Sequence, residues 1–137
     1  KFLADATQQH AQEYALANEG VEVVFRISIP SCERTALLMQ STGLIYTPDR
    51  EHFGIVPIEA MFLKVPVIAV NSGGPRETVL HGKTGFLCEQ SPDEFGAAML
   101  KLMQNKKEAD KSSAMGVTAK KHVQEKFSFN SMKSHVA

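Results

Sequence analysis

Three glutamates in the central part of the chain stand where carboxylates could accept hydrogen bonds from sugar hydroxyls. Glu51 follows a predicted strand, while Glu59 and Glu77 each lie two residues past a proline, Pro57 and Pro75, that suits the first position of a helix. A carboxylate is repelled by a diphosphate, so we expect these side chains to bind the hydroxyl groups that flank one. A nucleotide sugar carries a ribose and a hexose on either side of its diphosphate. This pattern favours Glu59 for one sugar and Glu51 for the other.

The same glutamates also have a purely structural explanation. At the third position of a helix an acid offsets the helix dipole by roughly 0.3–1 kcal/mol, or it completes a capping box. A capping box needs Ser or Thr at the N-cap, whereas Val56 and Gly74 stand at the expected N-caps. Helix capping and ligand binding therefore both remain open for Glu59 and Glu77.

Two loops at strand ends carry groups that suit a phosphate. In an open α/β sheet, ligands bind outside the carboxyl ends of the strands. After the strand predicted over 43–47, the segment 49–54 leads into a helix whose first backbone N–H groups can point at an anion. After the strand predicted over 65–70, Gly73 and Gly74 would let a ligand approach the backbone closely.

The hydrophobic pattern predicts an alternation of helices and strands that would position these loops. Helices are expected over 3–18, 31–40 and 57–63, from Pro75, from 91 through 103, and over 108–126. Strands are expected over 21–28, 43–47, 65–70 and 86–88. Strands that alternate with helices predict an α/β fold, with a Rossmann-like doubly wound parallel sheet and additional C-terminal helices.

The composition excludes several classes of protein. The chain has 137 residues, 43% apolar and 22% charged, which is typical of one globular domain. Fifteen basic and fifteen acidic side chains give no net charge, so a nucleic-acid partner is not expected. No apolar run approaches the roughly 18–20 residues of a membrane span, so the segment itself is expected to be soluble. Cys32 and Cys88 are predicted to be reduced thiols, and the scattered histidines predict no metal site.

Several motifs, in this order and at these spacings, resemble the family-4 retaining glycosyltransferases. They are the E-x7-E segment 51–59, Gly-Gly-Pro-x-Glu at 73–77 and Gly-x-Thr-Gly-Phe at 82–86. Within that family they are most similar to the dolichol-pathway mannosyltransferases. The resemblance implies a GT-B fold, in which two Rossmann-like domains face a cleft. Residues 1–137 would then form a single donor-binding C-terminal domain, with the N-terminal acceptor domain outside this chain.

The resemblance also implies roles for individual residues. Glu51 would contact the donor hexose as the catalytic residue, and Glu59 would bind the nucleotide ribose. The remaining donor-binding positions would be His52, Phe53, Gly54, Ile55, Val56, Gly73, Gly74 and Glu77. Among them, the backbone of 53–56 would bind the diphosphate and the sugar. His52 is also explained as a hydrogen-bond partner that is positioned by the neighbouring carboxylate.

The implied reaction transfers mannose from GDP-mannose to a lipid-linked, dolichyl-diphosphate oligosaccharide at the cytosolic face of the endoplasmic reticulum membrane. It would retain the anomeric configuration, use neither a metal nor another cofactor, and rely on the phosphate oxygens of the donor to help deprotonate the acceptor. The acceptor and the membrane would be bound by parts outside this chain, and the cationic residues that clamp the donor phosphates would lie on a strand and loop upstream of it. We therefore expect the chain alone not to transfer sugar.

Other functions fit some of the same residues. A nucleotide-sugar-binding module without transferase activity would carry the same loops, and related transferases that use UDP-glucose or ADP-glucose share the glutamate pair. A flavodoxin-like signalling domain would need a phospho-accepting Asp or a flavin loop at a strand end, where only Asp49 stands. Phe127 and Phe129 would either dock against the other domain or pack on their own.

Overall fold

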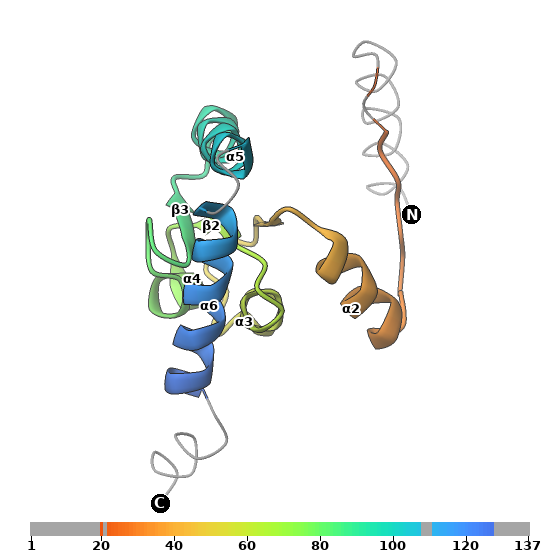
Figure 1. Cartoon of the computed structure of the whole chain (residues 1–137), viewed down its shortest axis with the longest axis horizontal. Coiled ribbons are helices and arrows are strands. Elements are labelled where there is room, and N and C mark those ends of the chain that lie inside the picture. Colours follow the sequence, from red (N-terminus) through yellow and green to blue (C-terminus); the bar gives the residue numbers. More distant parts are fainter. Residues whose placement is uncertain (1–19, 21, 108–110, 128–137) are drawn as a thin grey trace, which may run out of the picture. The chain divides into compact units, whose positions relative to one another are not determined.

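The computed structural model describes residues 20, 22–107 and 111–127. The chain divides into two compact units, Lys1–Glu33 and Arg34–Ala137, and each is described by itself. The elements along the chain are α2 (Ser31–Gln40), β1 (Leu44–Tyr46), α3 (Ile55–Phe62), β2 (Val67–Val70), α4 (Gly73–Thr78), β3 (Gly85–Cys88), α5 (Pro92–Lys107) and α6 (Lys111–Phe127) (Figure 1). The helix expected over 3–18 lies outside the described residues.

The strands of the unit Arg34–Ala137 form a parallel sheet in the order β1-β2-β3. Ile68 of β2 is paired with Ile45 of β1 and with Phe86 of β3. All four residues of β2 are buried, as the apolar run over 65–70 predicts for a central strand that is covered on both faces. Because the strands are parallel, the segments that follow β1 and β2 emerge at the same edge of the sheet.

Helices cover both faces of this sheet. Val67 and Ala69 of β2 belong to a core cluster that also contains residues of α3 and α6, and α6 packs against α3 (Figure 1). Ile68, between them in sequence, belongs to a second cluster with residues of α5. Successive side chains of a strand point to opposite faces, which explains the alternation. The predicted α/β fold with a doubly wound sheet and C-terminal helices is confirmed.

The prediction of a strand over 21–28 is wrong for residues 22–28, the described part of that segment. Residues 22–30 form neither strand nor helix. Their β-branched and aromatic side chains favour a strand, but a strand also needs a neighbouring chain for its N–H and C=O groups. The side chain of Ile27 is 81% exposed, so it is not packed on a sheet face. The sheet of the described residues therefore has three strands instead of four.

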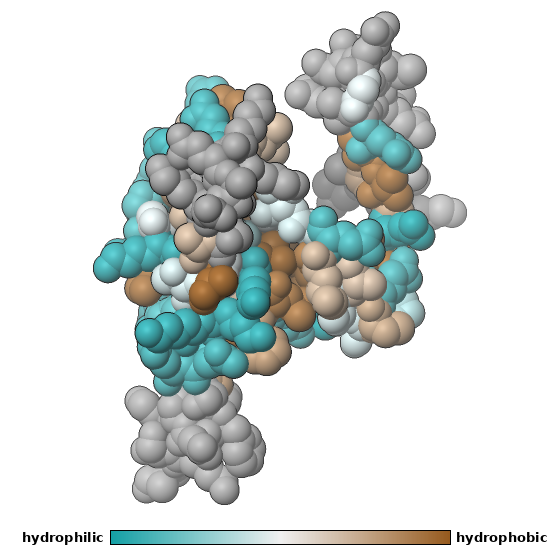
Figure 2. Space-filling view, viewed as in Figure 1, coloured by the Kyte–Doolittle hydropathy of each residue, from teal (hydrophilic) through white to brown (hydrophobic). Residues whose placement is uncertain are grey.

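The described surface mixes polar and apolar residues. On the face shown in Figure 2, apolar residues lie among hydrophilic ones, and the large apolar side chains exposed on the described surface include Met39, Ile55 and Met103. Within the described ranges, no helix combines the length and the apolar character that crossing a membrane requires.

Candidate functional site

Helix α3 begins two residues before the proline that was expected to start it. Its first residue is Ile55, and the N-cap is Gly54 at φ 74°, a left-handed conformation that glycine adopts without strain. Pro57 is therefore the third helical residue, still in the first turn, where a missing N–H breaks no helical hydrogen bond. Glu59 lies beyond the first turn, which contains no acidic residue. The structural explanation of Glu59 as an acid at the third helical position is wrong.

Helix α4 repeats this arrangement after β2. It begins at Gly73 with Ser72 as the N-cap, so Pro75 is again the third helical residue. Glu77 also lies beyond the first turn and is exposed, so the capping explanation is wrong for it too. The backbone carbonyl of Glu77 accepts a hydrogen bond of 2.6 Å from the ammonium group of Lys126 on α6. This contact joins the last turn of α6 to α4.

The loops after β1 and β2 touch each other through their backbones. The N–H of Gly74 donates a hydrogen bond of 2.5 Å to the carbonyl oxygen of Glu51. A Cβ atom on Gly73 would collide with the same carbonyl oxygen, and one on Gly74 would lie 2.5 Å from the carbonyl oxygen of Phe53. The close approach expected at these glycines is thus made by the chain's own backbone.

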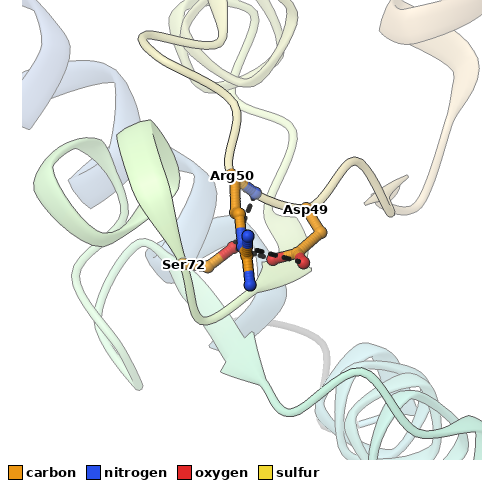
Figure 3. A network of polar contacts seen from close by, with 3 residues as sticks. All are labelled: Asp49, Arg50 and Ser72. Carbon is orange, nitrogen blue, oxygen red and sulfur yellow. Dashed lines mark hydrogen bonds and ion pairs between the residues drawn. The ribbon is translucent and has the colours of Figure 1, made fainter.

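A polar network fixes the residues just before Glu51 (Figure 3). The hydroxyl of Ser72 donates to Asp49 Oδ1 at 2.6 Å and accepts from the backbone N–H of Arg50 at 3.1 Å. The guanidinium Nε of Arg50 lies 3.8 Å from Asp49 Oδ2. Arg50 has φ 56°, which is uncommon for a residue other than glycine, and these contacts hold it there. The start of the E-x7-E segment is therefore tied to the N-cap of α4.

The predicted donor-binding residues 51–56 lie on this loop and at the start of α3, whereas Gly73, Gly74 and Glu77 lie on α4. Glu51 and Val56 are half-buried, Gly54 is buried, and His52 and Phe53 are exposed. Burial, and secondly the charge of Glu51, raise the pKa of the Tyr46 phenol at the end of β1. A tyrosine hydroxyl is protonated at neutral pH already at its ordinary pKa of about 10, so Tyr46 offers a hydrogen-bond donor beside this loop.

The end of α6 supports the same loop. The ring of Phe127 packs edge-on against Phe53, with ring centroids 5.9 Å apart and an interplanar angle of 84°. His122 lies 6.1 Å from Phe127 and shares a hydrogen bond of 3.0 Å with the carbonyl oxygen of Thr78. Phe127 thus packs on its own domain, which is the second of the two explanations considered. Phe129 lies outside the described residues.

Three residues make contacts at this site that the sequence did not predict. The guanidinium of Arg34 on α2 binds Glu59 Oε1 at 3.2 Å. Ser72 and Phe127 hold the Glu51 loop from α4 and α6. The one sequence signal for Arg34 is its position four residues before the apolar Leu38, which places both side chains on the same face of a helix. In the structure Leu38 is buried, so this face packs on the core. Phe127 was a packing candidate from the sequence and Ser72 directly precedes Gly73-Gly74, but their contacts with the Glu51 loop are recognisable only from the three-dimensional structure.

The two cysteines are not among the candidate site residues. Cys32 is exposed, Cys88 is buried, and both are unpaired thiols, as expected. Burial raises the pKa of the Cys88 thiol, as does the charge of Glu94, while Lys101 lowers it. Over the described ranges, three or more His, Cys, Asp or Glu side chains nowhere gather in a group that could hold a metal ion.

Known proteins resemble the chain over most of its length. A model of the family described as glycosyl transferases group 1 matches residues 4–122. The alpha-1,3/1,6-mannosyltransferase ALG2 of Dictyostelium discoideum is 45% identical over 119 residues, which cover 87% of this chain and 27% of that protein. The human ALG2 is 46% identical over 109 residues, with coverages of 80% and 26%. The chain thus spans about a quarter of the length of these relatives.

Solved structures share the fold. TarM has a TM-score of 0.73 at 21% identity, covering 94% of this chain and 26% of its own. Anabaena Alr3699/HepE in complex with UDP-glucose has a TM-score of 0.66 at 25% identity, with coverages of 96% and 35%. Both support the Rossmann-like fold of a GT-B glycosyltransferase. By its sequence over residues 4–122 and by its fold, this chain belongs to the glycosyl transferases group 1 family.

Proposed function

We propose that the chain is the donor-binding part of a retaining mannosyltransferase of this family, with GDP-mannose as donor. The observation that carries the proposal is the placement of Glu51 and Glu59 on one loop-helix segment, where β1 ends at the carboxyl edge of the sheet. Ligands of open α/β sheets bind at this edge. The relatives named as mannosyltransferases, at about 45% identity, support mannose as the sugar.

Each part of the segment has a proposed role. Glu59 binds the ribose hydroxyls, and Glu51 contacts the hexose as the catalytic residue. Between them, the N-terminus of α3 faces the diphosphate, because its first backbone N–H groups, those of Ile55 and Val56, have no acceptor within the helix. His52, Phe53 and Gly54 are the remaining residues of the segment that would line the donor site. The backbone of Glu51 is held by Gly74, which leaves its carboxylate for the donor.

The second loop completes the proposed donor site. Gly73 and Gly74 keep the loop before α4 against the Glu51 loop, and Glu77 offers a further carboxylate on α4. Residues 1–137 would serve as a single donor-binding domain. The acceptor, a lipid-linked dolichyl-diphosphate oligosaccharide, would be bound by a separate N-terminal domain. The whole enzyme would act at the cytosolic face of the endoplasmic reticulum membrane.

The proposed reaction retains the anomeric configuration and needs no metal, because the donor's own phosphate oxygens help to deprotonate the acceptor. No protein nucleophile is then required. We expect the chain of 137 residues to bind the donor without transferring mannose, since it would lack the acceptor site. Mannose transfer by the purified chain would contradict the proposal that the donor and the acceptor are bound by different domains.

Calorimetric titration of the chain with GDP, GDP-mannose and UDP-glucose tests the donor site. We expect saturable GDP binding, which Glu59→Ala weakens by about 1–3 kcal/mol because ribose hydroxyls lose their acceptor. Glu125→Ala on α6 is the control, since that exposed carboxylate pairs with Lys121 and belongs to no candidate site. Absence of nucleotide binding, or equal effects of the two variants, would contradict the proposal.

A different nucleotide is the second candidate. The structural neighbour Alr3699/HepE was solved with UDP-glucose and is 25% identical to this chain. Tighter binding of UDP-glucose than of GDP-mannose in the same titration would assign a uridine donor to the same glutamates. A nucleotide-sugar-binding module without transferase activity would give the same binding data, and only a transfer assay on a protein that also carries an acceptor domain separates it from an enzyme.

A further inference from the structure

Arg34 is held on the face of α2 that packs against the core. Leu38, one turn later on α2, is 7% exposed and belongs to the core cluster that contains Ala60 and Met61 of α3. Residues four positions apart lie on the same face of a helix. Burial of Leu38 therefore turns the Arg34 side chain toward α3, immediately beside Glu59.

The resulting contact occupies one of the two carboxylate oxygens of Glu59. Arg34 Nη2 donates to Glu59 Oε1 at 3.2 Å, and the two side chains are 38% and 36% exposed. An ion pair of this exposure adds little to the stability of a fold. It does restrict the rotamers of a glutamate, which is otherwise a flexible side chain. A carboxylate can accept about four hydrogen bonds, so Oε2 is left for a ligand.

We propose that Arg34 is a positioning residue for Glu59: its guanidinium holds the carboxylate in the orientation that binds the two ribose hydroxyls of a nucleoside diphosphate. This inference rests on the proposed function of Glu59. A carboxylate that is already oriented loses less conformational freedom when the ligand binds, so the affinity is higher. The planar guanidinium fixes this direction better than a flexible ammonium group would.

Two other roles make different predictions. If Arg34 only stabilises the packing of α2, its removal weakens the binding of every nucleotide equally. If Arg34 instead competes with the ribose for Glu59, its removal strengthens binding. A readout that isolates the hydroxyl contact separates these roles from the proposed one. The ratio of the affinities for GDP and for 2′,3′-dideoxyguanosine diphosphate is such a readout, because the two ligands differ only in the hydroxyls.

The experiment measures this ratio by calorimetry for the wild-type chain and for Arg34→Met, Arg34→Lys, Glu59→Gln and the double variant Arg34→Met/Glu59→Gln. We expect the wild type to prefer GDP by about tenfold, the order of one or two hydrogen bonds. Arg34→Met should lower the preference severalfold, and Arg34→Lys should restore part of it. In the Glu59→Gln background, Arg34→Met should have no further effect, because the pair is already broken.

The control is Arg26→Met, which removes one arginine from an ion pair with Glu33, at 3.5 Å, that includes no candidate site residue. It should leave the preference unchanged.

An unchanged preference in Arg34→Met, or stronger GDP binding, would overturn the positioning role while leaving Glu59 as the ribose ligand. A wild type without preference, or a Glu59→Gln variant that keeps it, would show instead that the proposed function of Glu59 is wrong. Circular dichroism establishes that each variant is folded. If Arg34→Met does not fold, the comparison of Arg34→Lys with the wild type still tests the positioning role.

Discussion

The backbone N–H of Gly74 donates its hydrogen bond to the carbonyl oxygen of Glu51, so the first turn of α4 holds the loop that carries the proposed catalytic carboxylate. The two strands that precede these loops are neighbours in the sheet. Their carboxyl ends are thus joined a second time, beyond the sheet, through main-chain atoms. A substitution in one loop is expected to displace the other.

Gly74→Ala tests this junction directly. Its new Cβ would lie 2.5 Å from the carbonyl oxygen of Phe53, a backbone atom that cannot move without shifting the Glu51 loop. We expect a loss of at least ~2 kcal/mol in the free energy of unfolding, from overpacking, and loss of GDP binding. The matched control is Gly96→Ala on α5, where a Cβ meets nothing within 4 Å. Denaturant unfolding should show that this control is stabilised by up to ~1 kcal/mol, because alanine favours the helix.

Ser72→Ala should loosen the same junction more mildly. The variant removes the hydrogen bond to Asp49 and the one from the Arg50 backbone, which together are worth about 1–2 kcal/mol. Ser41→Ala removes one exposed hydrogen bond, to the carbonyl of Leu37, and serves as the control. Thermal unfolding and GDP titration of both variants check the expectation. Equal effects of the two variants on GDP affinity would show that the network does not support the donor loop.

The contact between Phe53 and Phe127 should couple α6 to the Glu51 loop, the proposed donor loop. Phe127→Leu removes an edge-to-face pair that is worth about 0.5–1.5 kcal/mol beyond its buried area. We expect both the stability and the GDP affinity to fall. A double-mutant cycle with Phe53→Leu measures the coupling, and additive effects on stability would contradict it. Phe62→Leu on α3 is a suitable control, since this exposed ring contacts Lys120 instead.

The two cysteines should differ in reactivity and in their contribution to pH-dependent stability. Burial, reinforced by Glu94, raises the pKa of Cys88 in the folded chain, so its thiol is protonated over a wider range than in the unfolded chain. The folded state therefore binds a proton more tightly, and the stabilisation is complete below the ordinary thiol pKa of about 8.5 and is lost as the pH rises above it. Urea unfolding between pH 7 and 10 should show this decline, and Cys88→Ala should flatten it.

At pH 7.5 a thiol reagent should modify the exposed Cys32 much faster than Cys88; equal rates would contradict the burial of Cys88.

The sequence predicted the elements that depend on local pattern. The apolar run 65–70 is typical of a covered strand, and the E-x7-E spacing made Glu51 and Glu59 candidates, which the structure places in the loop after β1 and on α3. The helix starts were two residues late because a proline is tolerated anywhere in the first turn, so Pro57 marks the beginning of α3 only approximately. The segment 21–28 was assigned to a strand from its propensity, although a strand depends on its neighbours.

The contacts that shape the candidate site were beyond the reach of sequence patterns. Arg34 and Glu59 lie 25 residues apart in the chain, and no spacing rule connects them, because their meeting depends on how α2 packs. Gly73 and Gly74 were expected to make room for a ligand, and the structure shows that they make room for the loop of Glu51. A sequence pattern shows which backbone conformations and contacts a residue allows, whereas the tertiary fold determines which residue it contacts.

The packing of Phe127 against Phe53 has a consequence for how the protein is made. Contacts between residues far apart in sequence form late, and synthesis delivers the chain from its N-terminus. A nascent chain that has emerged through α5 already contains the complete Glu51–Glu59 segment, but it does not yet contain the ring that packs edge-on against Phe53. The Glu51 loop therefore gains this contact only after α6 has been translated. A premature stop codon between α5 and the end of α6 would leave every motif of the proposed donor site in place and still remove the contact between Phe127 and Phe53.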